Sequence, residues 1–145
     1  MITRTSKNLT ALAVTAALFT APAAMSLDVA LTNDDGWDAP GIQAIYDALK
    51  EQHAVTLAGS ATGQSGSSAA INTDTIFVTK QVDGDDPQYS VATGPLPDSE
   101  GAEPATAGLI AVQLAGSPDL LLSGINAGAN IGSATQISGT VGATV

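Results

Sequence analysis

Two short apolar runs, separated by a stretch with the periodicity of a helix, dominate the first half of the domain. Leu27 to Thr32 (LDVALT) and Ala54 to Ala58 (AVTLA) are both short and mostly apolar, as is typical of strands buried on both faces. Between them, apolar residues recur at the spacing of one helix face. These residues are Ile42, Ile45, Tyr46 and Leu49. We therefore predict a right-handed strand-helix-strand unit, with Asp38 as the helix N-cap and Pro40 in the first turn.

The second half of the chain predicts a hairpin, a helix and one more strand. Asp74 to Lys80 and Tyr89 to Thr93 flank the turn residues 83–87, as in an antiparallel hairpin. Ala105 to Ala115 is mostly apolar and long enough for a helix, although Gly108 weakens it. Asp119 to Leu122 (DLLL) predicts a last buried strand. This order favours an α/β fold with a mostly parallel sheet and flanking helices.

Composition changes the interpretation of residues 1–26. Arg4 and Lys7 precede a short apolar run from Leu9 to Thr20, and small residues follow it. This pattern predicts a cleaved secretory signal peptide, because the run is shorter than the roughly 20 apolar residues that span a bilayer. We expect a periplasmic or secreted product, without membrane attachment after cleavage, in which residues 27–145 form the domain.

The charge and the metal-binding residue types exclude several kinds of site. The formal net charge is -10, with 14 acidic residues against 4 Lys and Arg, which argues against polynucleotide partners because phosphate backbones are bound by Lys and Arg. The chain has no cysteine, and its single histidine, His53, follows the first predicted helix. We expect His53 to be a surface residue remote from any site, so a zinc centre of nitrogen and sulfur ligands is excluded.

The strongest candidate chemistry is the carboxylate pair Asp34-Asp35, which directly follows the first strand and precedes Gly36. Two adjacent like charges raise the free energy unless a cation or strong donors compensate them. The carboxyl ends of parallel strands meet at one edge of a sheet. Ser65, after the second strand, and Asn126, after the last one, should therefore join the pair. Such hard oxygen donors suit Mg²⁺ or Mn²⁺.

The glycine-rich end of the chain suggests a phosphate pocket beside that metal. Asn126 and Asn130 lie in the run Ser123 to Gly132, and Ser138 and Thr140 follow it. Glycines permit close approach of the backbone, and a helix beginning near Ser138 would offer free amides to an anion. A phosphate bridging the metal and these amides would be attacked in line. A series of Gly and Asn turns without a ligand is the alternative.

The motifs together resemble the SurE family of metal-dependent nucleotidases. Those that carry the resemblance are Leu31 to Gly41 (LTNDDGWDAPG), Gln64 to Gly66 (QSG), Ser123 to Gly132 (SGINAGANIG) and Ser138 to Val141 (SGTV). Their order and spacing are more specific than any one of them. The resemblance implies a Rossmann-like α/β phosphatase that uses a divalent cation to remove phosphate from nucleoside 5'- or 3'-monophosphates.

Particular residues acquire roles from this resemblance. It implies that Asp34, Asp35, Ser65 and Asn126 are metal ligands, and that Asn130 and the segment Ser138 to Thr140 line the phosphate pocket. Asp34, Asp35, Asn130, Ser138 and Thr140 are therefore our candidate catalytic residues. Attack by a metal-activated water and covalent attack by an aspartate both remain open.

The resemblance covers the chain from about Leu27 to its end, whereas family members continue further into an oligomerising segment. We therefore expect a truncated chain with exposed apolar surface, and a homo-oligomer for full-length members. Two alternative functions are an exported acidic β-solenoid or adhesin fragment, and an inactive remnant that binds metal or phosphate without turnover. No repeat of the kind expected in a solenoid is visible in the sequence.

Overall fold

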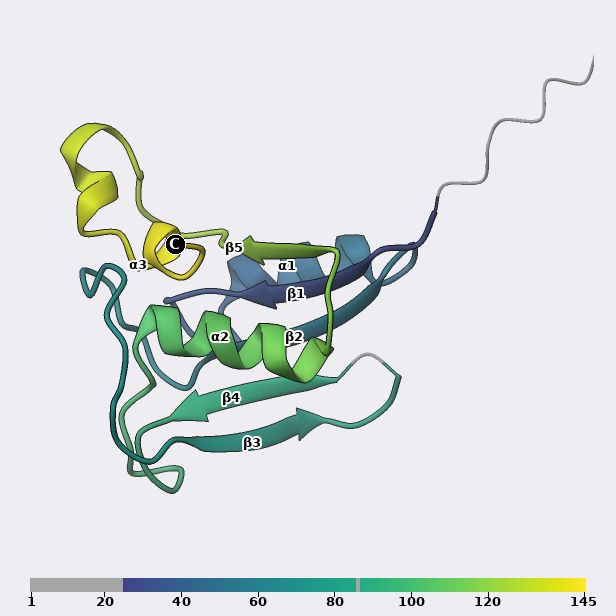
Figure 1. The fold of residues 1–145 in the computed structure, drawn as a ribbon, viewed down its shortest axis with the longest axis horizontal. Coiled ribbons are helices and arrows are strands. Elements are labelled where there is room, and N and C mark those ends of the chain that lie inside the picture. Colours follow the sequence, from purple (N-terminus) through teal and green to yellow (C-terminus); the bar gives the residue numbers. More distant parts are fainter. Residues whose placement is uncertain (1–24, 86) are drawn as a thin grey trace, which may run out of the picture.

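A computed structural model describes residues 25–85 and 87–145, so the predicted signal peptide lies outside the described residues except for its last two positions. One five-stranded sheet has the order β3-β4-β2-β1-β5 (Figure 1). The strands are β1 (Asp28–Thr32), β2 (Ala54–Ser60), β3 (Phe77–Val82), β4 (Gln88–Ala92) and β5 (Leu120–Ser123). β3 is antiparallel to β4, and the other three pairs are parallel. The predicted mostly parallel sheet and the hairpin are confirmed.

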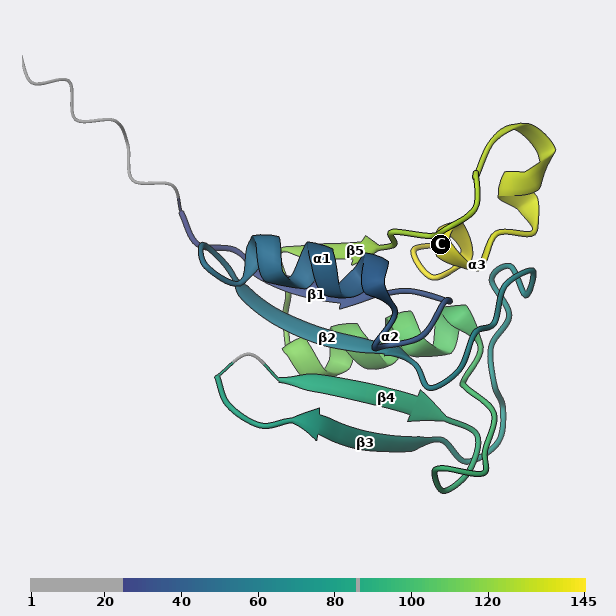
Figure 2. The same ribbon diagram turned by 180° about the vertical axis from the view of Figure 1, so that it is seen from behind.

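Two helices cover opposite faces of the sheet, α2 in front in Figure 1 and α1 in front in Figure 2. α1 (Pro40–Leu49) buries Ile42 and Tyr46 in a cluster that includes Leu31 of β1 and Leu57 of β2. Burial on both faces accounts for the nearly continuous apolar runs of these central strands.

The face under α2 (Pro104–Ala115) is built largely from alanine. Ala111 packs in one cluster with Ala30 of β1, Ala58 of β2 and Val91 of β4. Only 3% of all residues are aromatic, and small side chains let this helix lie close to the sheet.

The beginning of α1 differs from the prediction. Ala39, not Asp38, is the N-cap, and it makes no side-chain capping bond. A turn after Gly36, closed by a bond of 3.1 Å from Ala39 N to Gly36 O, moves the helix start by one residue. Pro40 then occupies the first helical position, where its missing N–H costs nothing.

All five strands have bounds that differ from the prediction, β2 and β3 by the most. β2 continues through Gly59 to Ser60, whose hydroxyl donates to Ala102 O at 2.7 Å, so polar residues are accommodated inside the sheet. β3 begins later than predicted, at Phe77, because pairing with β4 begins there, opposite Ala92.

His53 lies at the amino end of β2, away from the carboxyl edge of the sheet, as predicted. It is nevertheless half-buried, and its Nδ1 accepts a hydrogen bond of 3.2 Å from Leu27 N. The expectation of a plain surface residue is therefore wrong, because the imidazole ties the entry of β1 to the sheet. Within 25–85 and 87–145, no helix has the length and apolarity needed to cross a bilayer.

Candidate active site

The carboxyl ends of β1, β2 and β5 converge at one edge of the sheet. Asp34 follows β1 and is only 1% exposed, whereas Asp35 is half-buried. The backbone carbonyl of Asp34 accepts a bond of 2.7 Å from Gln64 N, which holds the loop after β2 beside β1. Gly124 N donates to Thr32 O at 3.0 Å, which continues the pairing of β5 with β1 beyond the strands. The prediction that these three ends meet is therefore confirmed by the geometry.

A cleft of about 350 Å³ opens where these segments meet. Six of the seven predicted site residues line it: Asp34, Asp35, Ser65, Asn126, Asn130 and Ser138. Thr140 is not part of the lining, although it contacts Asp34. The cleft is therefore acidic and rich in oxygen atoms.

Asp35 is held by the loops on either side of it. Its Oδ2 accepts a bond of 3.2 Å from Ala127 N, and the Ser65 hydroxyl lies 3.5 Å from its Oδ1. The second distance is at the long limit for a hydrogen bond. Ser65 and Asp35 are therefore neighbours in the lining of the cleft.

Asp34 is positioned by the C-terminal segment. Thr140 Oγ1 donates to Asp34 Oδ1 at 2.7 Å and accepts from Asn126 Nδ2 at 2.8 Å. One threonine hydroxyl therefore couples an implied metal ligand from β1 to another from the loop after β5. Thr140 is a positioning residue in this arrangement, which differs from its predicted place in the phosphate pocket.

Gly139 lies directly against the Asp34 carboxylate. A Cβ added at Gly139 would lie 2.6 Å from Asp34 Oδ2 and 2.7 Å from Asp34 Cβ. A real Cβ atom does not approach other heavy atoms that closely. Glycine at this position is therefore what lets the C-terminal segment approach Asp34.

The predicted helix near Ser138 exists, but it is a single turn. α3 (Gly139–Gly142) has Ser138 as its N-cap, whose Oγ accepts from Val141 N at 3.2 Å. The bonded amide is that of Val141, which directly follows the Ser138 to Thr140 amides predicted to face an anion. A 3₁₀ turn, η1 (Gly132–Gln136), precedes α3 and was not predicted.

The residues at the cleft fit a hard divalent cation. Asp34 Oδ2 is buried and makes no hydrogen bond to the described part of the chain, and an unpaired buried carboxylate oxygen is costly without a cation or donor. Within 25–85 and 87–145, no three His, Cys, Asp or Glu side chains gather as a metal cluster. The available donors are instead two carboxylates, one hydroxyl and one amide oxygen, the set that Mg²⁺ or Mn²⁺ accepts together with water.

Sequence reasoning missed the backbone groups of the site. The amides of Gln64 and Ala127 fix the two aspartates, and backbone donors carry no side-chain signal. Gly139 did have a signal, since it lies between Ser138 and Thr140 in a motif already noted. The sequence could not show that the Asp34 carboxylate lies against this position and leaves space only for glycine.

Comparison with known proteins agrees with this geometry. The family model for survival protein SurE matches residues 29–145. The chain is 40% identical over 116 residues to the 5'-nucleotidase SurE of Magnetococcus marinus, covering 79% of this chain and 43% of that protein. It is 39% identical over 120 residues to the 5'-nucleotidase SurE of Natronomonas pharaonis, covering 82% and 42%.

A solved structure shows the same fold. The crystal structure of the SurE protein from Aquifex aeolicus aligns with a TM-score of 0.62 and 31% identity, over 79% of this chain and 44% of that chain. This chain therefore spans less than half the length of the relatives that it matches.

Proposed function

The chain belongs to the survival protein SurE family, and we propose that its acidic cleft is the site of a metal-dependent phosphomonoesterase that hydrolyses nucleoside 5'- or 3'-monophosphates. The observation that carries the proposal is the buried, unpaired Oδ2 of Asp34 at a cleft shared with Asp35, Ser65 and Asn126. Mg²⁺ or Mn²⁺ is the cofactor whose charge and ligand preference match that cleft.

Each residue has a separate task in this proposal. Asp34, Asp35, Ser65 and Asn126 would hold the cation, which when bound lowers the pKa of water and offsets phosphate charge. Thr140 and the Ala127 amide keep the two carboxylates in place. Asn130 and Ser138, which line the same cleft, would contact the phosphate oxygens. Attack by water or by an aspartate carboxylate are the two routes compatible with this arrangement.

Two alternative functions, a β-solenoid fragment and an inactive remnant, can be distinguished from the proposed enzyme. The helices α1 and α2 on both faces of the sheet disfavour a β-solenoid. A remnant that binds without turnover would show Mn²⁺ or phosphate binding but no phosphate release. Export to the periplasm remains a proposal, which cell fractionation tests, and so does assembly into a homo-oligomer.

The test is a charge-neutral substitution at the buried carboxylate. Phosphate release by the full chain would be measured with 5'-AMP and 3'-AMP in Mg²⁺ or Mn²⁺. Asp34→Asn should lower it by more than roughly 100-fold, because a ligand of the cation is lost. Asp83→Asn is the matched control, since this acid is exposed in the β3–β4 turn at the opposite end of the sheet. Undiminished turnover in Asp34→Asn would sink the assignment.

A further inference from the structure

A second cleft, of about 420 Å³, opens between the start of α1 and the segment after β5. Ala39 and Pro40 contribute apolar surface from the helix start, and Ile125 contributes it from the other segment. Ile125 is 56% exposed, so its side chain is accessible to a ligand in this cleft. We call this space the Ile125 cleft.

The Ile125 cleft adjoins the acidic cleft. Asp35, Asn126 and Ala127 line both of them. A ligand with one group beside Asp34 and Asp35 has the Ile125 cleft within reach of its remaining part. The two clefts differ in chemistry, one being acidic and the other mostly apolar.

The polar groups at the junction are already bonded within the chain. Asp35 Oδ2 accepts from Ala127 N, Asn126 Oδ1 accepts from Gly128 N at 3.0 Å, and Asn126 Nδ2 donates to Thr140. Because the proposed function assigns the remaining lone pairs of Asp35 and Asn126 to the cation, apolar contact is the main interaction that the Ile125 cleft offers to the rest of a ligand. A ligand that binds there should present apolar surface, since burying such surface is what gains free energy.

The apolar wall is held at a fixed distance from α1. The carbonyl group of Ile125 lies directly against Gly41, where any Cβ would collide with it. Because the backbone of α1 itself braces this segment, the Ile125 side chain is presented in place before a ligand arrives. A preformed apolar surface binds with less loss of conformational entropy than a mobile one.

We infer that the Ile125 cleft binds the organic group of a phosphomonoester whose phosphate lies in the acidic cleft, and that Ile125 is a specificity-determining residue. This inference rests on the proposed function for its ligand. A nucleoside presents the flat apolar face of its base, whereas glycerol presents hydroxyl groups that Ile125 cannot satisfy. The cleft should therefore favour nucleotides over phosphate esters of small hydrophilic alcohols.

The test is equilibrium binding of three probes to the full chain, by isothermal titration calorimetry in Mn²⁺. The probes are 5'-AMP, glycerol 3-phosphate and adenosine. Ile125→Ala should lower the affinity for 5'-AMP by about fivefold to tenfold relative to the affinity for glycerol 3-phosphate, because the removed carbons no longer bury apolar area. The affinity for adenosine should fall by the same factor. Ile71→Ala is the matched control, since Ile71 is 60% exposed in a groove that does not include these residues, and it should keep the wild-type ratio.

Each outcome decides between the two proposals. An unchanged ratio in Ile125→Ala, or equal weakening of all three probes, overturns the role of Ile125. Should Ile125→Ala fail to fold by circular dichroism, Ile125→Val should lower the ratio by about twofold to fourfold. Adenosine binding that depends on Ile125 without any phosphate release supports the apolar cleft and rejects the nucleotidase. Phosphate release without adenosine binding supports the nucleotidase and rejects the role of the Ile125 cleft.

Discussion

One hydroxyl group ties a carboxylate to a side-chain amide at the cleft. Thr140 donates to Asp34 and accepts from Asn126, so it fixes two of the proposed metal ligands without being part of the cleft lining. Residues that orient ligands in this way tune metal affinity although they do not touch the metal. Its contribution is therefore separable from that of the ligands.

We predict that Thr140→Val weakens Mn²⁺ binding by about tenfold, because Asp34 Oδ1 loses its donor. Electron paramagnetic resonance titration of Mn²⁺ measures this. Thr140→Ser, which keeps the hydroxyl, should restore most of the affinity. Thr144→Val is the control, since the Thr144 hydroxyl bonds only the backbone of Val141 within the described structure. Wild-type affinity in Thr140→Val would show that Asp34 needs no support.

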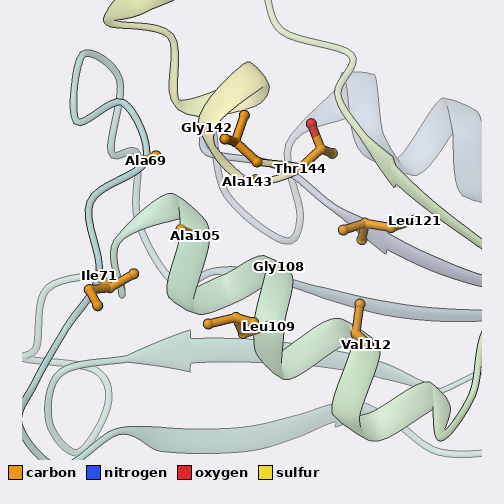
Figure 3. A pocket seen from close by; sticks show the side chains of 11 residues that line it. Ala69, Ile71, Ala105, Gly108, Leu109, Val112, Leu121, Gly142, Ala143 and Thr144 are labelled. Atoms are coloured by element: carbon orange, nitrogen blue, oxygen red, sulfur yellow. The ribbon is translucent and has the colours of Figure 1, made fainter.

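The contact between two helices determines whether that hydroxyl reaches the site. Gly108 of α2 lies directly against the carbonyl of Ala143, at the end of the α3 turn (Figure 3). The sequence suggested that Gly108 merely weakens a helix. In the structure it is instead the position at which the C-terminal segment packs onto α2, and that segment carries Gly139 and Thr140 to Asp34.

We predict that Gly108→Ala lowers the free energy of unfolding by about 1–3 kcal/mol, since the new methyl group displaces Ala143. In an unencumbered helix the same change would stabilise by roughly 0.5–1 kcal/mol. Urea denaturation measures the difference. Gln113→Ala, on the exposed side of α2, reports the propensity effect alone. A more stable Gly108→Ala protein would mean that α3 does not depend on this contact.

At the scale of the whole molecule, apolar surface remains uncovered. A groove of about 290 Å³ is lined by Ile71, by Leu109 of α2, by Leu121 of β5 and by the last residues of the chain. Figure 3 shows these side chains. Ile71 and Leu109 are more than half exposed. The sequence predicted such exposure from the resemblance to a longer family, and this chain spans less than half the length of its relatives.

We predict that the isolated chain self-associates through this groove, because contiguous exposed apolar surface promotes association. Size-exclusion chromatography with light scattering should show large species for the wild-type chain, and fewer for the double substitution Ile71→Gln and Leu109→Gln. Ile131→Gln, at an exposed isoleucine outside the groove, should leave the distribution as it is. A monomeric wild-type chain with a cooperative thermal transition contradicts the prediction.

Hydrophobic periodicity and residue type were enough to determine several features of this protein. The α/β class, the order of strands and helices, and the meeting of Asp34, Ser65 and Asn126 all follow from local patterns, because the carboxyl ends of parallel strands share one edge. The motif order was enough to suggest the family. Errors in the predicted elements were shifts of boundaries, such as Ala39 in place of Asp38 as the cap, where one local turn moves a helix start by a residue. The burial of His53 and the 3₁₀ turn η1 were missed.

Only the tertiary structure decided how the side chains at that edge interact. Thr140 and Asp34 are 106 residues apart in sequence, and Ala127 and Asp35 are 92 apart, so no local pattern contains either contact. The Ile125 cleft likewise lies between two segments that are remote in sequence, where the Ile125 carbonyl packs against Gly41 of α1. Local sequence specifies which groups are available, whereas packing between remote segments sets the distances at which they act.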